Sequence, residues 1–323
     1  MDWKDEFLRL YMSTNMDEVQ QAIKLKEEYI PWHLYRYRPA KQKEFVANEL
    51  MGQIYMPHIS ELNDPFDSCA LLSNENANYY FVDRGFRKEI ETIIGAKIPD
   101  DALRSDHLKG DILSYALSYI GCSDEKKIEK LKEYQAEDKK SIEDANRHFN
   151  DIIKRYYRLC CFSESAHNLP MWNHYANGHS GICLQYDTLR FRYNDSLRKQ
   201  LFPVIYTKKL PDALEVIKNR HFENLPIALF ERVLISKLKD WEYEKEWRLL
   251  LNCRQIIPEN EKVSDDYWDT GKIEYLTRPS KVYLGVNTSQ DMKKFVFDIC
   301  KKFDIEVCQM RCTEYGLKEF LIE

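Results

Sequence analysis

The segment GICLQY, residues 181–186, is a short apolar run bounded by turn-forming or polar residues, and this pattern predicts a strand. Three other runs have the same character: LCCFS at 159–163, FPVIYT at 202–207 and WRLLLN at 247–252. We expect these four segments to form the main sheet. The sheet would then collect pieces that lie far apart along the chain.

The N-terminal part predicts a helix followed by a strand, helix, strand unit. Asn15 can cap an amphipathic helix over residues 17–29. LYRYR at 34–38 and QIYMP at 53–57 have the composition of strands, and EFVANELM at 44–51 has that of a short helix.

Residues 81–158 change character, because long helical patterns with alternating charge signs dominate them. We interpret this region as a helical insertion or subdomain within a single domain that spans residues 1–323. The sparse apolar stripe that favours a helix here consists of Ile128, Leu131, Ile142, Ala145, Phe149 and Ile152.

The C-terminal part returns to alternating elements. Residues 211–241 are predicted to be helical, with a break near Pro226. KVYLG at 281–285 and IEVCQMR at 305–311 are predicted strands around a helix at 289–303, a pattern that gives a right-handed crossover if the strands are parallel. The predicted fold class is therefore α+β, with a mixed or mostly antiparallel central sheet.

Composition excludes several classes of protein. The net charge is -5 and the pI is near 6.0, so no global basic field favours non-specific binding to nucleic acid. Nine cysteines, an odd number that includes the adjacent pair Cys160 and Cys161, suit reduced thiols and a cytoplasmic location. The first residues lack an apolar core of signal-peptide length, and we expect no membrane-spanning segment.

The best-known signatures of nucleotide, zinc-protease and hydrolase sites are missing. The sequence has no GxGxxG, GxxxxGK[ST], HExxH or GxSxG motif and no paired CxxC. Chemistry must therefore be sought in four other short motifs.

The first motif is LYRYR. On a strand, alternation places Leu34, Arg36 and Arg38 on one face and Tyr35 and Tyr37 on the other. An arginine flanked by aromatic rings can bind a phosphate or carboxylate with two hydrogen bonds. The alternative is an edge strand with solvated arginines.

The second motif is SELNDPFD, residues 60–67. Asn63 and Asp64 precede a proline and favour a turn, with Asp67 close behind. These groups could orient a ribose or hold a metal. The alternative is that they hydrogen-bond their own backbone.

The third motif is MWNHYANGHSGICLQYD, residues 171–187. Trp172, His174 and Tyr175 are large rings with polar tips, which near a strand edge can enclose a planar base or nicotinamide. His174 and His179 are five residues apart, so we predict no metal there. The alternative makes Trp172 a core anchor and gives His174 a capping or packing role.

The fourth motif is KDWEYEKEWRLLL, residues 239–251. Glu242, Glu244 and Glu246 share one face if the segment is extended, and such carboxylates can act as acid, base or ribose ligand. Like charges on one face repel each other unless a ligand, a metal or Arg248 compensates them. The alternative is a solvated entry to a strand.

The order of these motifs resembles the bacterial family known as domain of unknown function 2971, over roughly residues 33 to 312. The family name implies no activity. The motif order is also similar to that of the ADP-ribosyltransferase fold, which implies a sheet with a cleft that binds NAD. This chain departs from that fold in lacking a middle-strand Ser-Thr-Ser motif.

The second resemblance implies a role for particular residues. Arg36 would bind the dinucleotide phosphate or ribose, and Glu246 or Glu244 would hydrogen-bond the nicotinamide ribose. The third motif would pack on nicotinamide through Trp172, His174 or Tyr175. The predicted catalytic residues are Glu246, Glu244 and His174, and the predicted NAD-binding residues are Arg36, Tyr37, Asn63, Asp64, Trp172 and Tyr175.

The expected function is therefore that of an NAD-dependent ADP-ribosyltransferase or NAD glycohydrolase that acts as a bacterial defence or toxin effector on a protein or nucleic-acid acceptor. A metal-dependent nuclease that uses Asp64 or Asp67 with Glu244 and Glu246 is one alternative. A non-catalytic sensor or adaptor for a nucleotide or protein partner is another. The sequence leaves the oligomeric state open.

Overall fold

In a computed structural model of the chain, contacts divide it into two compact units. The sheet unit consists of Met1–Ser68, Lys154–Lys209 and Glu231–Glu323, and the helical unit consists of Cys69–Ile153 and Leu210–Phe230. Most of the predicted helical segment 81–158 falls in the helical unit, and its role as an insertion or subdomain within a single domain stays a prediction. The structure describes residues 2–72, 85–103, 108–193, 195–214, 227–256, 263–275 and 277–322.

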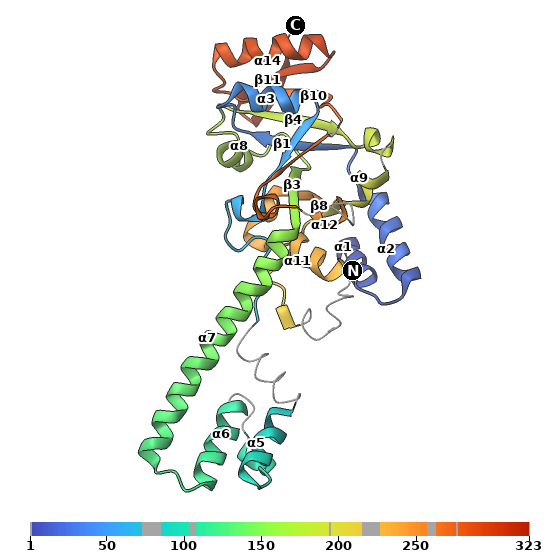
Figure 1. The fold of residues 1–323 in the computed structure, drawn as a ribbon. Helices are drawn as coiled ribbons and strands as arrows, with labels where there is room; N and C mark the ends of the chain where they lie inside the picture. Colours follow the sequence, from blue (N-terminus) through green and yellow to red (C-terminus); the bar gives the residue numbers. More distant parts are fainter. Residues whose placement is uncertain are drawn as a thin grey trace. The chain divides into compact units, whose positions relative to one another are not determined.

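An eight-stranded sheet organises the described part of the sheet unit, in the order β12-β11-β10-β4-β1-β3-β8-β5 (Figure 1). Every neighbouring pair is antiparallel except β10 and β11. The predicted fold class, α+β with a mostly antiparallel sheet, is confirmed. The strands are β1 His33–Arg38, β3 Tyr157–Ser163, β4 Ile182–Asp187, β5 Leu201–Pro203, β8 Glu246–Asn252, β10 Lys281–Leu284, β11 Glu306–Thr313 and β12 Gly316–Leu321.

The predicted C-terminal crossover is also confirmed. β10 and β11 pair in parallel, with Val282 opposite Val307, and the helix α14 (Gln290–Lys302) connects them. Ser289 caps this helix by accepting a hydrogen bond from the backbone N–H of Met292.

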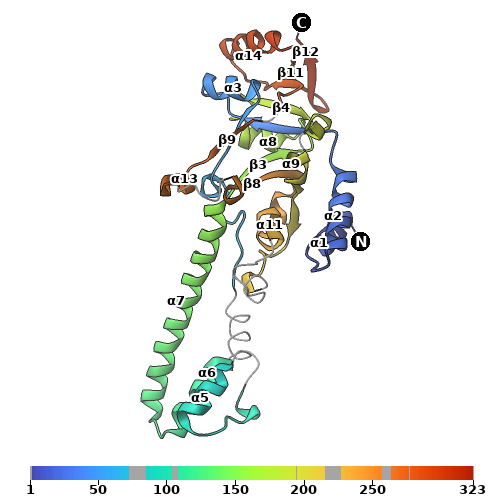
Figure 2. The same cartoon turned by 45° about the vertical axis from the view of Figure 1, so that its right-hand side comes forward.

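Helices cover both faces of the sheet (Figures 1 and 2). α14 and α3 (Lys43–Leu50) pack into a core that includes Leu34 of β1. α8 (Leu169–Tyr175) packs into a separate core that includes Tyr37 of β1. Leu34 and Tyr37 thus face opposite sides of the sheet, and the predicted alternation of side chains along LYRYR is confirmed.

Two small strand pairs accompany the main sheet. β2 (Gln53–Met56) pairs antiparallel with β9 (Lys272–Tyr275), and β6 (Ile205–Thr207) pairs in parallel with β7 (Ser236–Leu238). The prediction of one strand over residues 202–207 was wrong, because Val204 separates β5 from β6.

The prediction of a helical region over residues 211–241 was wrong near its C-terminal end, where β7 forms. The helix α11 (Ile227–Ile235) stops where Ser236 turns its hydroxyl back to the carbonyl of Arg232, 2.7 Å away. β7 and the 3₁₀ helix η6 (Lys239–Glu244) follow. The break predicted near Pro226 lies outside the described residues.

The N-terminal segment contains two helices, α1 (Trp3–Tyr11) and α2 (Met16–Tyr29). The prediction of α2 and its cap is confirmed, since Asn15 accepts a hydrogen bond of 2.9 Å from the N–H of Asp17. The sequence prediction missed α1, which is short and stacks the ring of Trp3 on Tyr29 at 4.3 Å.

The helical unit contains α5 (Arg87–Ile94), α6 (Leu108–Tyr119) and most of α7 (Asp124–Tyr156). The predicted apolar stripe of α7 is confirmed at Ile142, which is buried, but Ile128 near the start of the helix is exposed. Among the described residues, no helix is both long and apolar enough to cross a membrane.

Candidate functional site

The sheet opens between the neighbouring strands β1 and β3. β1 pairs with β4 along its whole length, but it meets β3 at a single position, Tyr35 opposite Ser163. Because the strands diverge beyond this contact, side chains from both can face a common space. A cavity of about 270 Å³ occupies this position. Its walls include Tyr35, Arg36, Tyr37 and Arg38 of β1, Leu159–Ser163 of β3, and Asn63, Asp67, Met171, Tyr175, Lys237, Glu244 and Glu246.

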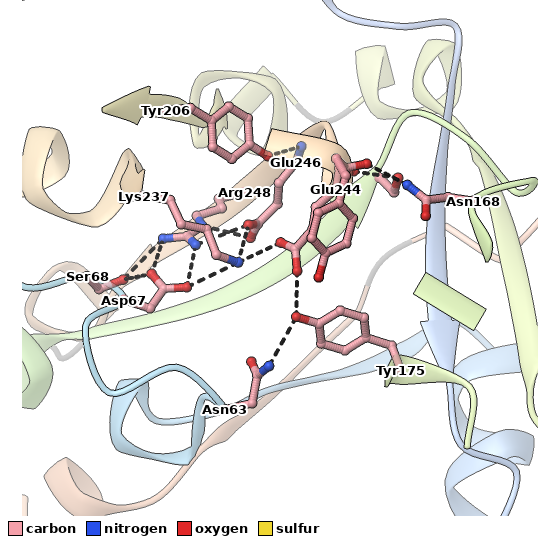
Figure 3. Close-up of polar contacts among 12 residues, drawn as sticks. Asn63, Asp67, Ser68, Asn168, Tyr175, Tyr206, Lys237, Glu244, Glu246 and Arg248 are labelled. Carbon is pink, nitrogen blue, oxygen red and sulfur yellow. Dashed lines mark hydrogen bonds and ion pairs between the residues drawn. The ribbon is translucent and has the colours of Figure 1, made fainter. Parts of the chain in front are cut away.

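A buried ion network forms one wall of the cavity (Figure 3). The Lys237 ammonium lies 2.6 Å from a carboxylate oxygen of Glu244, 3.0 Å from one of Glu246 and 3.5 Å from one of Asp67. β7 supplies the lysine, the end of η6 supplies Glu244, and β8 begins with Glu246. The network therefore joins the small β6–β7 pair to the main sheet.

Arg248 completes the network from the next inward-facing position of β8. Its two terminal nitrogens each donate to a different oxygen of Asp67 at 2.7 Å, and its Nε donates to Glu246 at 2.8 Å. The guanidinium is fully buried. A charge in such a place is stable only while its partners remain, so this geometry fixes the positions of Asp67 and Glu246.

The turn before β8 decides which glutamates meet. Lys245 adopts a left-handed conformation with φ of 45°, after the 3₁₀ helix that contains Glu242 and Glu244. The segment is not extended, so the prediction that Glu242, Glu244 and Glu246 share one face was wrong for Glu242, whose side chain is exposed. Only the other two glutamates reach Lys237.

Glu244 has the environment of an acid–base group. Burial and the neighbouring Glu246 raise its pKa to about 7, against the opposing effect of Lys237. The hydroxyl of Tyr175 donates to its carboxylate at 2.6 Å, and the amide of Asn63 donates to that hydroxyl at 3.2 Å.

The neighbours of Glu244 keep their ordinary charges. Burial alone would raise the pKa of Glu246, but Arg248 and Lys237 lower it below its usual range. Burial would likewise lower the pKa of Lys237, but the surrounding carboxylates, Glu246 first, hold it above its usual value. Ionised Glu244 therefore leaves three carboxylates against two cations, and this end of the cavity then carries one unbalanced negative charge.

Two arginines of β1 also line the cavity. Arg36 and Arg38 each place Nε 3.1 Å from the same oxygen of Glu49, so two cations share one carboxylate. Arg36 is buried and also donates to the carbonyl of Tyr55 at 2.9 Å. Arg38 retains a side-chain exposure of 28%, so it is the arginine that can meet a ligand.

Comparison with known proteins finds a family match in the segment that carries most of the ion network. Residues 171–249 match the family described as Protein of unknown function (DUF2971). The predicted resemblance is confirmed over this segment, which runs from α8 to the middle of β8 and carries Tyr175, Lys237, Glu244, Glu246 and Arg248. No curated protein and no solved structure matched the chain, so the similarity to ADP-ribosyltransferases stays a hypothesis.

Other predicted site residues of the DUF2971 segment lie elsewhere. Trp172 is fully buried, donates to the carbonyl of Ala166 at 2.7 Å and meets Tyr37 edge-on, which corresponds to the packing alternative. His174 is exposed and does not line the cavity. The structure thus brings Tyr175 to the cavity but not its two neighbours.

The predicted site residues outside the DUF2971 segment also include some that line the cavity and some that do not. Tyr37 lines the cavity while its hydroxyl donates to the carbonyl of Ser165 at 2.7 Å. Asp64 accepts a hydrogen bond of 2.9 Å from the N–H of Phe66. This agrees with the alternative in which the second motif hydrogen-bonds its own backbone. Asp67 instead belongs to the ion network.

Sequence reasoning missed Lys237, which is the centre of the network. A signal was available, because this lysine interrupts the apolar run VLISKL at residues 233–238, where a charge needs a buried partner. Among the described residues, no group of three or more His, Cys, Asp or Glu side chains is arranged to hold a metal ion. The carboxylates named for the nuclease alternative, Asp67, Glu244 and Glu246, surround Lys237.

Proposed function

We propose that this chain is an enzyme that breaks the bond between nicotinamide and ribose in NAD and transfers ADP-ribose to water or to an acceptor. The observation that carries the proposal is Glu244, a buried carboxyl at the cavity with a pKa of about 7. A group that titrates near neutral pH can both take and release a proton during turnover.

The charge distribution of the cavity supports this substrate. Glu244, once ionised, favours a cation beside it, and the partly exposed guanidinium of Arg38 favours an anion. The nicotinamide half of NAD has both features, because its pyridinium ring is cationic and its phosphate is anionic. Tyr35 and Tyr175 line the same cavity and supply rings on which a planar cation can stack.

The chemistry follows from these positions. When the bond between ribose C1′ and the ring nitrogen breaks, the electron pair leaves with nicotinamide, which becomes neutral, and the ribose becomes an oxocarbenium ion. Ionised Glu246 and Glu244 stabilise that positive charge. As the acceptor oxygen bonds to C1′, its proton passes to Glu244. Tyr175 and Lys237 hold the Glu244 carboxylate in place for that transfer.

The test measures nicotinamide release from NAD by liquid chromatography. Glu244→Gln keeps the shape of the side chain but cannot accept the proton, so we expect release to fall by about 10²- to 10⁴-fold. Glu242→Gln is the matched control, because Glu242 lies on the same 3₁₀ helix with an exposed side chain. Equal rates in all three proteins would refute the role of Glu244.

One observation favours a second candidate, a sensor that binds the nucleotide without turnover. Asp67, Glu244 and Glu246 are already paired with Lys237, Arg248 and Tyr175, so the network is complete without a substrate. A sensor would show a rise in melting temperature with NAD and no nicotinamide release, since a ligand that binds only the folded state must stabilise it.

We also propose a cellular role that follows from this activity. An enzyme of this kind would lower the NAD content of its cell, which is how it would act as the toxin or defence effector predicted from the sequence. A cytoplasmic location suits this proposal, because the chain's nine cysteines, all of them described, are reduced.

A further inference from the structure

A second cavity, of about 630 Å³, adjoins the first. The two share three wall residues, Arg38, Pro57 and Glu61. A ligand in the first cavity can therefore continue past Arg38 into the second.

The second cavity has apolar walls on two sides. Phe45 and Asn48 line it from α3, and Tyr55 and Ile273 line it from the β2–β9 pair, where they lie directly opposite each other. Phe45 is 56%, Tyr55 38% and Ile273 61% exposed, whereas their strand neighbours Ile54 and Met56 are 1% exposed. Large apolar side chains gathered around an open cavity mark a binding surface more often than a packing defect.

Neighbouring residues fix the position of the Tyr55 side chain. Its hydroxyl lies 3.0 Å from both carboxylate oxygens of Glu61, and its ring packs on Gly271. A Cβ at position 271 would come within 2.3 Å of ring atoms of Tyr55, so only glycine leaves the ring in this place. The aromatic wall is thus formed before any ligand arrives, which reduces the entropy lost on binding.

The junction of the two cavities attracts anions. Arg38 lines both and shares the single carboxylate of Glu49 with Arg36, while the other acidic residue of the junction, Glu61, accepts from the hydroxyl of Tyr55. Oε1 of Glu49 lies 3.1 Å from the Nε atoms of Arg36 and Arg38, yet it accepts no well-aligned hydrogen bond. The guanidinium groups therefore keep N–H donors that can bind other partners. Phosphate oxygens are the preferred partners of an exposed guanidinium.

We propose that the second cavity binds the base of a nucleoside diphosphate, with the phosphates at Arg38 and the heterocycle between Phe45 and Tyr55. This deepens the proposed function and rests on it for the identity of the whole substrate: the second cavity takes the adenosine half of NAD while the first takes the nicotinamide half. Asn48 is one of the polar wall residues and could contact the base.

The test uses ADP, which lacks nicotinamide, in isothermal titration calorimetry. Stacking of a base on an aromatic side chain contributes enough that Phe45→Ala should weaken ADP binding by about tenfold or more. Gly271→Ala, which displaces the ring of Tyr55, should weaken it in the same direction. Tyr315→Ala is the control, because Tyr315 is almost fully exposed on the turn between β11 and β12.

A second probe, ribose 5-phosphate, separates the base from the phosphate. Its binding should fall with Arg38→Gln and stay within about twofold with Phe45→Ala, because it has no base to stack. Because Phe45 is exposed, its replacement should leave the unfolding temperature unchanged.

Two outcomes overturn the inference: ADP fails to bind the unaltered protein, or Phe45→Ala binds ADP as tightly as the unaltered protein does. Neither depends on turnover. If ADP binds and Phe45→Ala loses it while no nicotinamide is ever released from NAD, the second cavity stands as assigned and only the proposed reaction fails.

Discussion

Arg248 and Lys237 hold full charges in the interior of the sheet unit, where isolated ions are strongly unfavourable. Each is tolerated because carboxylates surround it: Arg248 contacts Asp67 and Glu246, and Lys237 contacts these two and Glu244. Such a network adds little net stability compared with an apolar core, but removal of one member leaves a buried charge unpaired.

Arg248→Met tests this dependence. It keeps much of the side-chain volume but leaves Asp67 and Glu246 with Lys237 alone, so we expect the free energy of unfolding to fall by about 3 to 5 kcal/mol. Urea denaturation followed by circular dichroism measures the change. Lys239→Met is the control, because its pair with Glu242 at 3.8 Å is exposed and should contribute less than about 1 kcal/mol. Equal losses in the two variants would contradict the proposed dependence.

The pKa of Glu244 predicts how stability varies with pH. The folded protein holds a proton on this carboxyl up to about pH 7, whereas the ordinary value is 4.5. Between these values the folded state binds more protons than the unfolded state, so stability declines as pH rises, by up to about 3 kcal/mol. Glu246 has the opposite sign: its lowered pKa gives stability that is lost on acidification below its ordinary range.

Glu244→Gln should abolish the first of these effects. The difference in the free energy of unfolding, unaltered protein minus variant, should therefore decrease from about pH 5 to about pH 8. Urea denaturation at several pH values in this interval measures it, and taking the difference cancels the other titrating groups. If the two stability curves run parallel, the Glu244 pKa is not raised. Glu242→Gln, which changes an exposed carboxyl, should give parallel curves.

At the scale of elements, the sequence predicted what depends on local pattern. The apolar runs that become β3, β4 and β8 were found, and so was the parallel crossover of β10, α14 and β11. η6 and the turn at Lys245 were missed, because a left-handed residue leaves no trace in hydrophobic periodicity.

The pairing of Asp67 with Arg248 was beyond prediction for a different reason. Asp67 and Arg248 are 181 residues apart, and nothing in either segment indicates that they pair. Glu244 and Glu246 were both predicted as catalytic residues because they lie in one short motif, and Tyr175 was predicted within another. That the strands carrying these motifs meet around one cavity is a property of the sheet order.

Two glycines at the ends of strands lie so close to other backbone that their replacement by alanine should destabilise the protein. A Cβ at Gly181, just before β4, would lie 2.2 Å from the backbone carbonyl oxygen of Arg38, and one at Gly285, just after β10, would lie 2.2 Å from that of His179. Backbone cannot move aside as a side chain can, so Gly181→Ala and Gly285→Ala should each destabilise the protein by about 1 to 3 kcal/mol.

Gly110 is the contrasting position. It lies in α6 with no atom within 4 Å of the added Cβ, so Gly110→Ala should leave stability unchanged or raise it by about 0.5 to 1 kcal/mol. Thermal unfolding of the three variants compares them directly. A loss of stability for Gly110→Ala as large as that for Gly181→Ala would mean that the close backbone contacts are not the cause.

At the scale of the whole molecule, every residue of the two cavities and of the ion network belongs to the sheet unit. The helical unit has polar contacts of its own. Asn150 of α7 accepts from the N–H of Ala70 at 3.0 Å and donates to its carbonyl at 3.0 Å, and Asn146 contacts Leu72 in the same way at 2.7 and 3.2 Å. These two asparagines hold the segment after Ser68 against the helix.

Asn150→Ala therefore tests whether the two units are energetically separate. It leaves the buried N–H of Ala70 without its partner, so we expect a loss of about 1 to 3 kcal/mol within the helical unit. Hydrogen exchange read by mass spectrometry should then accelerate in peptides of α6 and α7, while peptides of β1, β4 and β8 and the affinity for ADP stay unchanged. Asn173→Ala, at an exposed position of α8, is the control and should alter neither. If exchange in the central strands rises together with that in α7, the two units unfold as one, and residues of the helical unit must then be counted among those that maintain the site.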